Sequence, residues 1–466
     1  MQRERLGSRL GFILLSAGCA IGVGNVWKFP WMAGTYGGGA FVLIYLLFLI
    51  ILGLPVMVME FSLGRASQAS PVALYQKLEK PGQKWHLHGY AALVANFLLM
   101  MFYTSVTGWI LYYFVAFLSG KMTGITNDAS AAQFGTMLSS PAITVGFMAI
   151  VVVVGFLILS FGLQKGVERV TKYMMLALLA LMIVLAINSF TLDGAKEGLS
   201  FYLKPDLSKI NGNVIVGAMN QAFFTLSLGI GSMAIFGSYI GKERSLVGES
   251  INVLVLDTFV AIVAGLIIFP ACFTFDVEPG AGPSLLFVAM AKVFNNMAGG
   301  RWWGSLFFLF MVFAAFSTII AVFENILACV RELKGWGRAK ACIICGAAVL
   351  VLSVPCALGF NLWADFVPFA AGSSVLDLED FIVSNCMLPL GALCYVLFCV
   401  SKKGWGFDNF LEEANAGKGI KFKKWLRPYV TYVLPAIIIL IFIIGILNFQ
   451  FSDNFTLLGK IKELIK

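Results

Sequence analysis

Two apolar stretches of the chain contain residues whose types and spacing suit ligand binding. Residues 18–25 hold three glycines and Asn25, and residues 223–232 hold two glycines with Thr225, Ser227 and Ser232. Because glycine lowers helix stability by roughly 1 kcal/mol relative to alanine, both stretches should interrupt a helix. An interrupted helix frees backbone carbonyls, and neighbouring amide or hydroxyl side chains add oxygens. Close helix packing through small residues is the alternative, but it does not explain why each interruption opens one half of the chain.

A carboxylate lies in a further apolar run. Asp257 is the only ionisable residue before Pro270 in the run that starts at residue 252. Charged groups within a membrane are costly and are functional by default. We therefore interpret Asp257 as a site residue. The alternative is that Asp257 has a structural role as the partner of a polar neighbour.

Residues that could support catalysis are scarce. Cys342 and Cys345 have the spacing of a metal or redox pair, but no other ligand is near, so we expect thiols that face lipid or neighbouring helices. The only histidines, His86 and His88, are expected in a polar loop. An intramembrane enzyme would need a convergent nucleophile, base or metal set. The chain is therefore not expected to be an enzyme.

The composition indicates that these residues are positioned by the helices of a membrane protein. Of the 466 residues, 59% are hydrophobic and 12% are charged, whereas a soluble domain carries about 25% charged residues. This composition excludes a soluble enzyme, a disordered chain and a secreted disulfide module. A membrane-spanning helix needs about 20 mostly apolar residues. Eleven runs meet that requirement and predict an all-α polytopic membrane protein with 11 transmembrane helices: 10–34, 38–63, 88–118, 141–160, 170–190, 213–239, 252–274, 303–329, 341–358, 379–400 and 429–449.

The basic residues predict the orientation. Cytoplasmic loops are enriched in Lys and Arg, and most of the 33 such residues fall in segments on the same side as the N-terminus. We therefore expect a multi-pass protein of the cell inner (plasma) membrane, with its N-terminus cytoplasmic and its C-terminus outside. The net charge of +9 then reflects this orientation, and no nucleic-acid partner is expected.

The eleven runs divide into two related halves. Runs one to five and runs six to ten have inverted topologies, and paired interruptions in two such halves point to a secondary transporter with its site between them. The predicted parts are a first inverted repeat (1–190), an extracellular loop (191–212), a second inverted repeat (213–400), a cytoplasmic loop (401–428), an eleventh helix (429–449) and an extracellular tail (450–466).

At these interruptions the chain resembles the bacterial amino-acid branch of the neurotransmitter:sodium symporter family. The resemblance rests on an ordered set of motifs: residues 9–12 (RLGF), 22–30 (GVGNVWKFP), 37–41 (GGGAF), 55–60 (PVMVME), 221–229 (QAFFTLSLG) and 376–381 (LDLEDF). It covers about residues 3–449. It implies the leucine-transporter fold, a 5+5 inverted repeat with broken helices 1 and 6, plus one extra helix. The family's usual twelfth helix is missing here.

The resemblance implies two Na⁺ sites, and sodium prefers oxygen ligands. The first would use the Ala20 carbonyl with the side chains of Asn25, Thr225 and Asp257, completed by the substrate carboxylate. The second would use three carbonyls and two hydroxyls, from Gly18, Ile21, Ala314, Ser317 and Thr318.

No chloride is expected. Chloride-dependent relatives hold the anion with Tyr, Gln, Thr and Ser; the first three match Tyr45, Gln221 and Thr225, whereas Ala261 stands at the serine position. We therefore expect the Asp257 carboxylate to supply the negative charge.

The expected substrate is a small-molecule L-amino acid. Monoamine members place an aspartate where this chain has Gly22, so the substrate should bring its own carboxylate. The resemblance assigns the carboxylate to the backbone N–H groups of Val23 and Gly24 and to the Tyr103 hydroxyl. It assigns the amine to Ala20, Phe224, Thr225 and Ser227. The side-chain pocket would be uncharged and formed by Leu99, Phe224, Ile230, Thr318, Ile319 and Val322, which suits a hydrophobic or aromatic side chain.

Two gates are expected by resemblance. Outside, Lys28 would pair with Asp380, although Lys28 could instead be a snorkelling lysine at a helix end. Inside, Arg3 would pair with Glu332.

The expected function is sodium-coupled symport of this amino acid into the cell by alternating access, with two Na⁺. A sodium-binding amino-acid sensor without net transport, and a carrier of the same fold with another coupling ion, remain alternatives. The lipid bilayer is an expected partner, and the sequence leaves the oligomeric state open.

Overall fold

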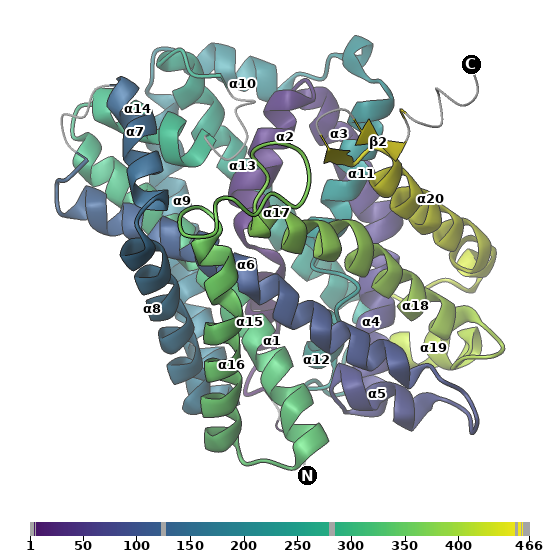
Figure 1. Cartoon of the computed structure of the whole chain (residues 1–466). Helices are drawn as coiled ribbons and strands as arrows, with labels where there is room; N and C mark the ends of the chain where they lie inside the picture. Colours follow the sequence, from purple (N-terminus) through teal and green to yellow (C-terminus); the bar gives the residue numbers. More distant parts are fainter. Residues whose placement is uncertain are drawn as a thin grey trace.

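The fold is an assembly of helices. The structure is a computed structural model that describes residues 4, 6–122, 127–278, 285–452, 455–457 and 459. Apart from a short hairpin of β1 (Gln450–Ser452) and β2 (Phe455–Thr456), the regular elements described are helical (Figure 1). The longest are α6 (His86–Leu118), α13 (Leu246–Thr274) and α15 (Gly300–Lys334). The predicted all-α class is confirmed.

Most of the predicted spans are continuous helical stretches, and two are interrupted. Within the described residues, nine helical stretches are long and apolar enough to cross a membrane: Gly39–Ser67, His86–Leu118, Pro141–Ser160, Leu163–Phe190, Leu246–Thr274, Gly300–Lys334, Arg338–Leu358, Val375–Val400 and Lys424–Leu447. A tenth candidate bends by 55° between Arg9–Ala20 and Gly24–Thr35. The sixth predicted run is divided into α11 (Gly212–Thr225) and α12 (Ser232–Gly237), which are too short to count. The nine continuous stretches correspond to the nine unbroken runs that the sequence predicts, and the two interrupted runs are the predicted first and sixth; helix length alone does not confirm the count of eleven.

The remaining elements complete these stretches or connect them. The stretches contain α1 (Arg9–Ala20), α2 (Phe29–Thr35), α3 (Gly39–Phe48), α4 (Leu54–Ser67), α8 (Pro141–Ser160), α9 (Arg169–Phe190), α16 (Arg338–Leu358), α17 (Val375–Asp380), α18 (Leu388–Val400) and α20 (Leu434–Leu447). Helical turns of π type occupy Gly24–Lys28, Leu49–Gly53, Leu163–Glu168, Leu285–Ala289, Phe381–Met387 and Tyr429–Val433, and 3₁₀ turns occupy Leu207–Lys209 and Lys424–Leu426. The shorter helices are α5 (Pro71–Leu78), α7 (Asn127–Leu138), α10 (Ala195–Leu203), α14 (Met290–Asn296) and α19 (Phe407–Ala414).

Helix α15 forms the centre of the bundle. It packs against α1, α6, α8 and α9. In its most apolar 18-residue segment 83% is buried, compared with 28% in the corresponding segment of the stretch that contains α20. A helix that is hydrophobic on all sides is stable only when surrounded by other helices or lipid. The centre is therefore formed by α15, and α20 contributes a lipid-facing surface.

The second interruption is a backbone feature that depends on glycine. Between α11 and α12, Ser227, Gly229 and Gly231 have φ values of 50°, 97° and 78°, a region that glycine enters without steric cost. A Cβ atom on Gly229 would overlap the Leu388 carbonyl of α18. The buried Glu60 of α4 accepts a hydrogen bond of 2.6 Å from the Gly229 N–H. The break is thus held by a carboxylate that replaces the missing helical acceptor.

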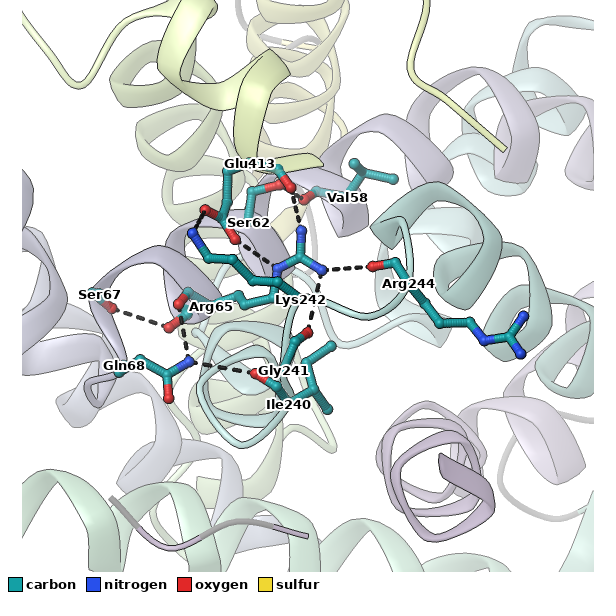
Figure 2. Close-up of polar contacts among 11 residues, drawn as sticks. Val58, Ser62, Arg65, Ser67, Gln68, Ile240, Gly241, Lys242, Arg244 and Glu413 are labelled. Carbon is teal, nitrogen blue, oxygen red and sulfur yellow. Dashed lines mark hydrogen bonds and ion pairs between the residues drawn. The ribbon is translucent and has the colours of Figure 1, made fainter. Parts of the chain in front are cut away.

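The segment 401–428 is folded onto the bundle at the end where α5 lies, opposite β1 and β2 (Figure 1). Figure 2 shows the guanidinium of Arg65, at the end of α4, enclosed by α19 and by the connection that follows α12. Its Nε lies 2.6 Å from Glu413 Oε1, its Nη1 donates to the Arg244 carbonyl at 2.7 Å, and its Nη2 donates to the Glu413 carbonyl. Lys242 adds an ion pair of 2.8 Å to Glu413. Because Arg65 is buried, loss of Glu413 would leave an uncompensated charge.

Candidate functional site

The first interruption meets α13 through an amide and a carboxylate. After α1 the backbone of Ile21 is extended, and a π-helical turn begins at Gly24. This turn places the Asn25 side chain against Asp257, with 2.8 Å between Nδ2 and Oδ1 and 3.1 Å between Nδ2 and the Asp257 carbonyl. Asn25 Oδ1 accepts from the Gly22 N–H at 3.1 Å. The only carboxylate of this part of α13 is therefore aimed at the first break.

The second interruption reaches the same carboxylate. Thr225, the last residue of α11, places its hydroxyl 3.2 Å from Asp257 Oδ2. Asn25, Thr225 and Asp257 are all buried. The structure thus brings together three side chains of the first predicted sodium site, from three different elements.

The residues matched to the chloride site are also in this region. Gln221 donates from Nε2 to the Gly24 carbonyl at 2.9 Å, which joins α11 to the first break. Among the described residues, Gln221 Oε1 and the Tyr45 hydroxyl are buried without a hydrogen-bond partner. Ala261, one helical turn after Asp257, is buried and offers no hydroxyl.

A second cluster of oxygens lies between α1 and α15. The Thr318 hydroxyl is 3.3 Å from the Gly18 carbonyl and 3.2 Å from the Ile21 carbonyl. The Ser317 hydroxyl is 3.1 Å from the Ile21 carbonyl and 2.8 Å from the Ala314 carbonyl. All five residues of the second predicted sodium site therefore converge. The carbonyls at the C-terminal end of α1 meet these hydroxyls because that end packs against the middle of α15.

The chemistry of the two clusters fits a hard monovalent cation. They offer carbonyl, amide and hydroxyl oxygens with a single carboxylate, and hard cations prefer such ligands. Within the part of the chain that the structure describes, no group of three or more His, Cys, Asp and Glu side chains could hold a metal ion.

A small cavity lies between the two interruptions. Its volume is about 20 Å³, and its walls contain most of the predicted substrate residues, together with Gly22 and Leu388: Ala20, Gly24, Leu99, Tyr103, Phe224, Thr225, Ser227, Ile230 and Thr318. The Tyr103 hydroxyl accepts from the Val23 N–H at 2.9 Å. A Cβ atom on Gly22 would overlap the Tyr103 and Thr318 hydroxyls, so any side chain there requires rearrangement. The cavity wall is uncharged.

Five residues differ from the predicted substrate residues. Gly22 lines the cavity without having been predicted, and Val23 was predicted but does not line it. Ile319 and Val322 are buried in α15 but do not line the cavity. Leu388, at the start of α18, lines it although no sequence motif marks it. The sequence around Leu388 does not distinguish it from other leucines of the apolar runs. Only the packing of α18 against the second break brings it to the cavity.

The predicted outer pair is not brought together. The Lys28 ammonium lies 3.7 Å from the centre of the Phe224 ring, which lines the cavity. Asp380 accepts from the Ser384 hydroxyl at 2.6 Å, and no ion pair links the described side chains of Lys28 and Asp380. A cation over an aromatic face is favourable. Lys28 therefore contacts a residue of the cavity wall.

The predicted inner pair of Arg3 and Glu332 cannot be compared, because Arg3 lies outside the described residues. Glu332 accepts from the Ser70 N–H at 2.9 Å and from the Ser70 hydroxyl at 2.6 Å, at the start of α5.

An acidic residue of the N-terminal segment binds basic residues near the ends of α15 and α16. Glu4 lies 2.8 Å from Arg331 and 3.4 Å from Arg338, and Arg338 also pairs with the buried Glu324. Burial raises the pKa of Glu4, but the hydrogen bond from Arg331 and the charges of both arginines outweigh it, so the pKa lies below its usual value. In this contact the acid lies in the N-terminal segment and the bases lie in the helices, opposite to the pair expected for Arg3 and Glu332.

Comparison with known proteins extends these observations. The model of the Sodium:neurotransmitter symporter family matches residues 3–126 and 128–456. The chain is 36% identical over 446 residues to the uncharacterized sodium-dependent transporter YhdH of Bacillus subtilis, covering 95% of this chain and 98% of that protein. It is 26% identical over 497 residues to the sodium-dependent serotonin transporter of Drosophila melanogaster, covering 96% of this chain and 77% of that protein.

A solved structure has the same architecture. The crystal structure of MhsT in complex with L-phenylalanine superposes with a TM-score of 0.85 and 35% sequence identity, covering 95% of this chain and 100% of that chain.

Proposed function

Since the chain belongs to the sodium:neurotransmitter symporter family, a family of transporters and not of enzymes, we propose that it imports a hydrophobic or aromatic L-amino acid together with Na⁺. Its leucine-transporter fold and its sodium dependence follow from this membership and from the match to MhsT. The observation that carries the substrate class is the uncharged cavity between two broken helices. A charged substrate side chain would be buried there without a partner.

The proposed substrate position uses the backbone of the first break. The substrate carboxylate would face Val23, Gly24 and the Tyr103 hydroxyl, because the N-terminus of a half-helix is a favourable anion site. The amine would face the carbonyls of the second break near Ser227. MhsT, which binds L-phenylalanine in its crystal structure, supports an amino acid with a large apolar side chain.

Two sodium ions are proposed, one in each oxygen cluster. Each ion gains about 2.3 kcal/mol from a potential of ~100 mV and about 1.4 kcal/mol from a tenfold gradient. Two ions then supply roughly 7 kcal/mol, enough for an accumulation of about 10⁵-fold. We also propose that chloride is not required, because Asp257 provides the negative charge beside the first cluster.

Both breaks act as hinges in the proposed mechanism. Each divides its span into two short helices, and the ions and substrate bridge the pieces to α13 and α15. Binding therefore stabilises one arrangement of the pieces, and release permits another. We place the N-terminus and α5 in the cytoplasm of a cell whose inner membrane holds the protein, as the distribution of Lys and Arg favours.

Uptake of a labelled L-amino-acid panel into proteoliposomes, with and without an inward sodium gradient, tests the proposal. Sodium-driven accumulation of one or a few apolar amino acids is the expected result. Sodium-dependent binding without accumulation would indicate a sensor, and accumulation driven by another ion gradient would indicate a different coupling ion.

A further inference from the structure

A groove with a volume of about 560 Å³ runs between α6 and α18, separate from the cavity between the breaks. Most of its wall is apolar, with Ala91, Ala92, Ala95, Met387, Leu390 and Cys394 among the lining residues. Leu87 and Leu390 are 58% and 41% exposed. Both helices belong to stretches that can cross a membrane, so a groove edged by exposed leucines opens towards lipid.

One end of the groove is basic and aromatic. Lys84 and Trp85 line it just before α6 begins. The Trp85 indole donates to the Lys403 carbonyl at 2.8 Å, and the Lys80 ammonium donates to the Lys402 carbonyl at 3.1 Å. These two contacts gather Lys80, Lys84, Lys402 and Lys403 at one helix end. The nearby Glu79 is engaged by His86, with 2.6 Å between Oε1 and Nδ1.

The other end of the groove is deep and neutral. From His88 to Ala95 the wall extends about 10 Å along α6, at 1.5 Å per residue. His88 is held by a hydrogen bond of 2.7 Å between Nδ1 and the Tyr75 hydroxyl. Gly229, in the second break, also lines the groove. A hydrocarbon chain suits this end, whereas a soluble ligand gains nothing from an opening towards lipid.

We propose that this groove binds an anionic phospholipid, with the phosphate beside the lysine cluster Lys80, Lys84, Lys402 and Lys403 and one acyl chain between α6 and α18. Basic pockets between transmembrane helices attract anionic head groups, and tryptophan is favoured at the interface between lipid and water. A zwitterionic head group would bring its own cation next to the lysine cluster. The charge of the cluster therefore selects the anionic lipid.

The position of the groove links lipid to transport. Gly229 lines the groove, while its neighbours Ser227 and Ile230 line the cavity between the breaks. An acyl chain at the bottom of the groove would therefore contact the far side of the same backbone segment that closes the cavity. The lipid would occupy a place that the second break must accommodate when it moves.

Photo-crosslinking of the full-length protein tests the proposal. The probe is phosphatidylglycerol with a diazirine on one acyl chain, in detergent micelles, and labelled peptides are identified by mass spectrometry. We expect labelling of peptides that contain residues 87–95 and 387–394, competed by unlabelled phosphatidylglycerol but not by phosphatidylcholine with the same chains.

Variants separate the head group from the chain. Lys84→Glu should lower the labelling at least about fivefold, since one basic charge near an anionic surface contributes about 1 kcal/mol. Ala91→Trp should lower it by filling the groove. Lys423→Glu, an exposed charge outside the groove, is the matched control. Equal competition by phosphatidylcholine, labelling spread evenly around the bundle, or labelling unchanged in both groove variants would each overturn the proposal.

Discussion

The amide of Asn25 binds two atoms of one residue: its Nδ2 lies 2.8 Å from the Asp257 carboxylate and 3.1 Å from the Asp257 carbonyl. A flexible break in the first span is thereby fixed to the rigid helix α13. Thr225 brings the second break to the same carboxylate at 3.2 Å. One buried charge consequently couples both hinges, and its removal should affect ion binding more than folding of the individual helices.

Asp257→Asn should weaken sodium binding while it retains the shape of the side chain. Loss of a charged partner costs about 1.5–3 kcal/mol, so the sodium concentration for half-maximal uptake should rise about tenfold to a hundredfold in chloride-free medium. Added chloride should restore part of the affinity, because Tyr45, Gln221 and Thr225 remain.

The wild type provides the complementary measurement. Its uptake should be equal in sodium chloride and sodium gluconate, and Asp206→Asn, an exposed aspartate, should behave in the same way. Chloride-dependent uptake by the wild type would contradict the proposed role of Asp257.

Thr318→Val removes a hydroxyl from the second oxygen cluster at almost constant volume. The hydroxyl lies 3.3 Å and 3.2 Å from the carbonyls of Gly18 and Ile21. We expect the half-saturating sodium concentration to rise about tenfold, equivalent to about 1.4 kcal/mol, with recovery of transport at high sodium. Thr104→Val, whose hydroxyl binds the Met100 carbonyl in α6, is the control. An unchanged sodium response at saturating substrate would exclude Thr318 as a ligand.

Tyr103→Phe should weaken binding of the amino acid. The hydroxyl binds the Val23 N–H at 2.9 Å and lines the cavity, so it is placed to contact the substrate carboxylate. Loss of one hydrogen bond to a charged group, about 1.5–3 kcal/mol, predicts an affinity at least about tenfold lower in equilibrium binding of the labelled substrate. Tyr90→Phe, on the exposed face of α6, should bind as the wild type does. If both variants bind equally well, the carboxylate does not contact Tyr103.

Some of this site was predictable because composition alone marks it. Glycine-rich stretches in apolar runs indicated both breaks, and an isolated carboxylate indicated Asp257. The elements that carry them converge as the ordered motifs implied. Such features depend on backbone preference and on the cost of burying a charge, and both are properties of the local sequence.

Other features of the site depend on which residues become neighbours, and only the packing of the helices determines that. The sequence motifs suggested Asp380 as the partner of Lys28, whereas in the structure Lys28 lies over the Phe224 ring. Leu388 lines the cavity because α18 packs against Gly229. Glu4 binds Arg331 across more than three hundred residues of sequence. Local patterns hold no information on these pairings.

The contact between Lys28 and Phe224 predicts a specific pattern of energetic coupling. In double-mutant cycles on substrate binding, Lys28→Met should couple to Phe224→Leu by about 0.5–2 kcal/mol, and its coupling to Asp380→Asn should be smaller. The cycles are measured by equilibrium binding of the labelled amino acid to purified protein. Stronger coupling of Lys28 to Asp380 than to Phe224 would contradict this prediction and would support the ion pair that the sequence suggested.

The Glu4 contact predicts how the N-terminal segment responds to charge and pH. Glu4→Gln should loosen the segment because it removes the ion pairs to Arg331 and Arg338 at 2.8 Å and 3.4 Å. At neutral pH, hydrogen exchange of residues 6–20 should be about two- to fivefold faster, as for a partly exposed ion pair. Glu412→Gln, an exposed glutamate of α19, is the control.

Protonation should reproduce the effect of Glu4→Gln only in acid. Because the pKa of Glu4 is lower in the folded protein than in the unfolded chain, its contribution to stability is complete above the ordinary carboxyl pKa and is lost as the pH falls through the lowered value. After correction for intrinsic exchange, the difference between wild type and Glu4→Gln should therefore be constant around neutral pH and should shrink only in acid. A difference that disappeared between pH 8 and pH 6 would assign the contact to another titrating group, and equal exchange in both proteins at neutral pH would show that Glu4 does not hold the segment.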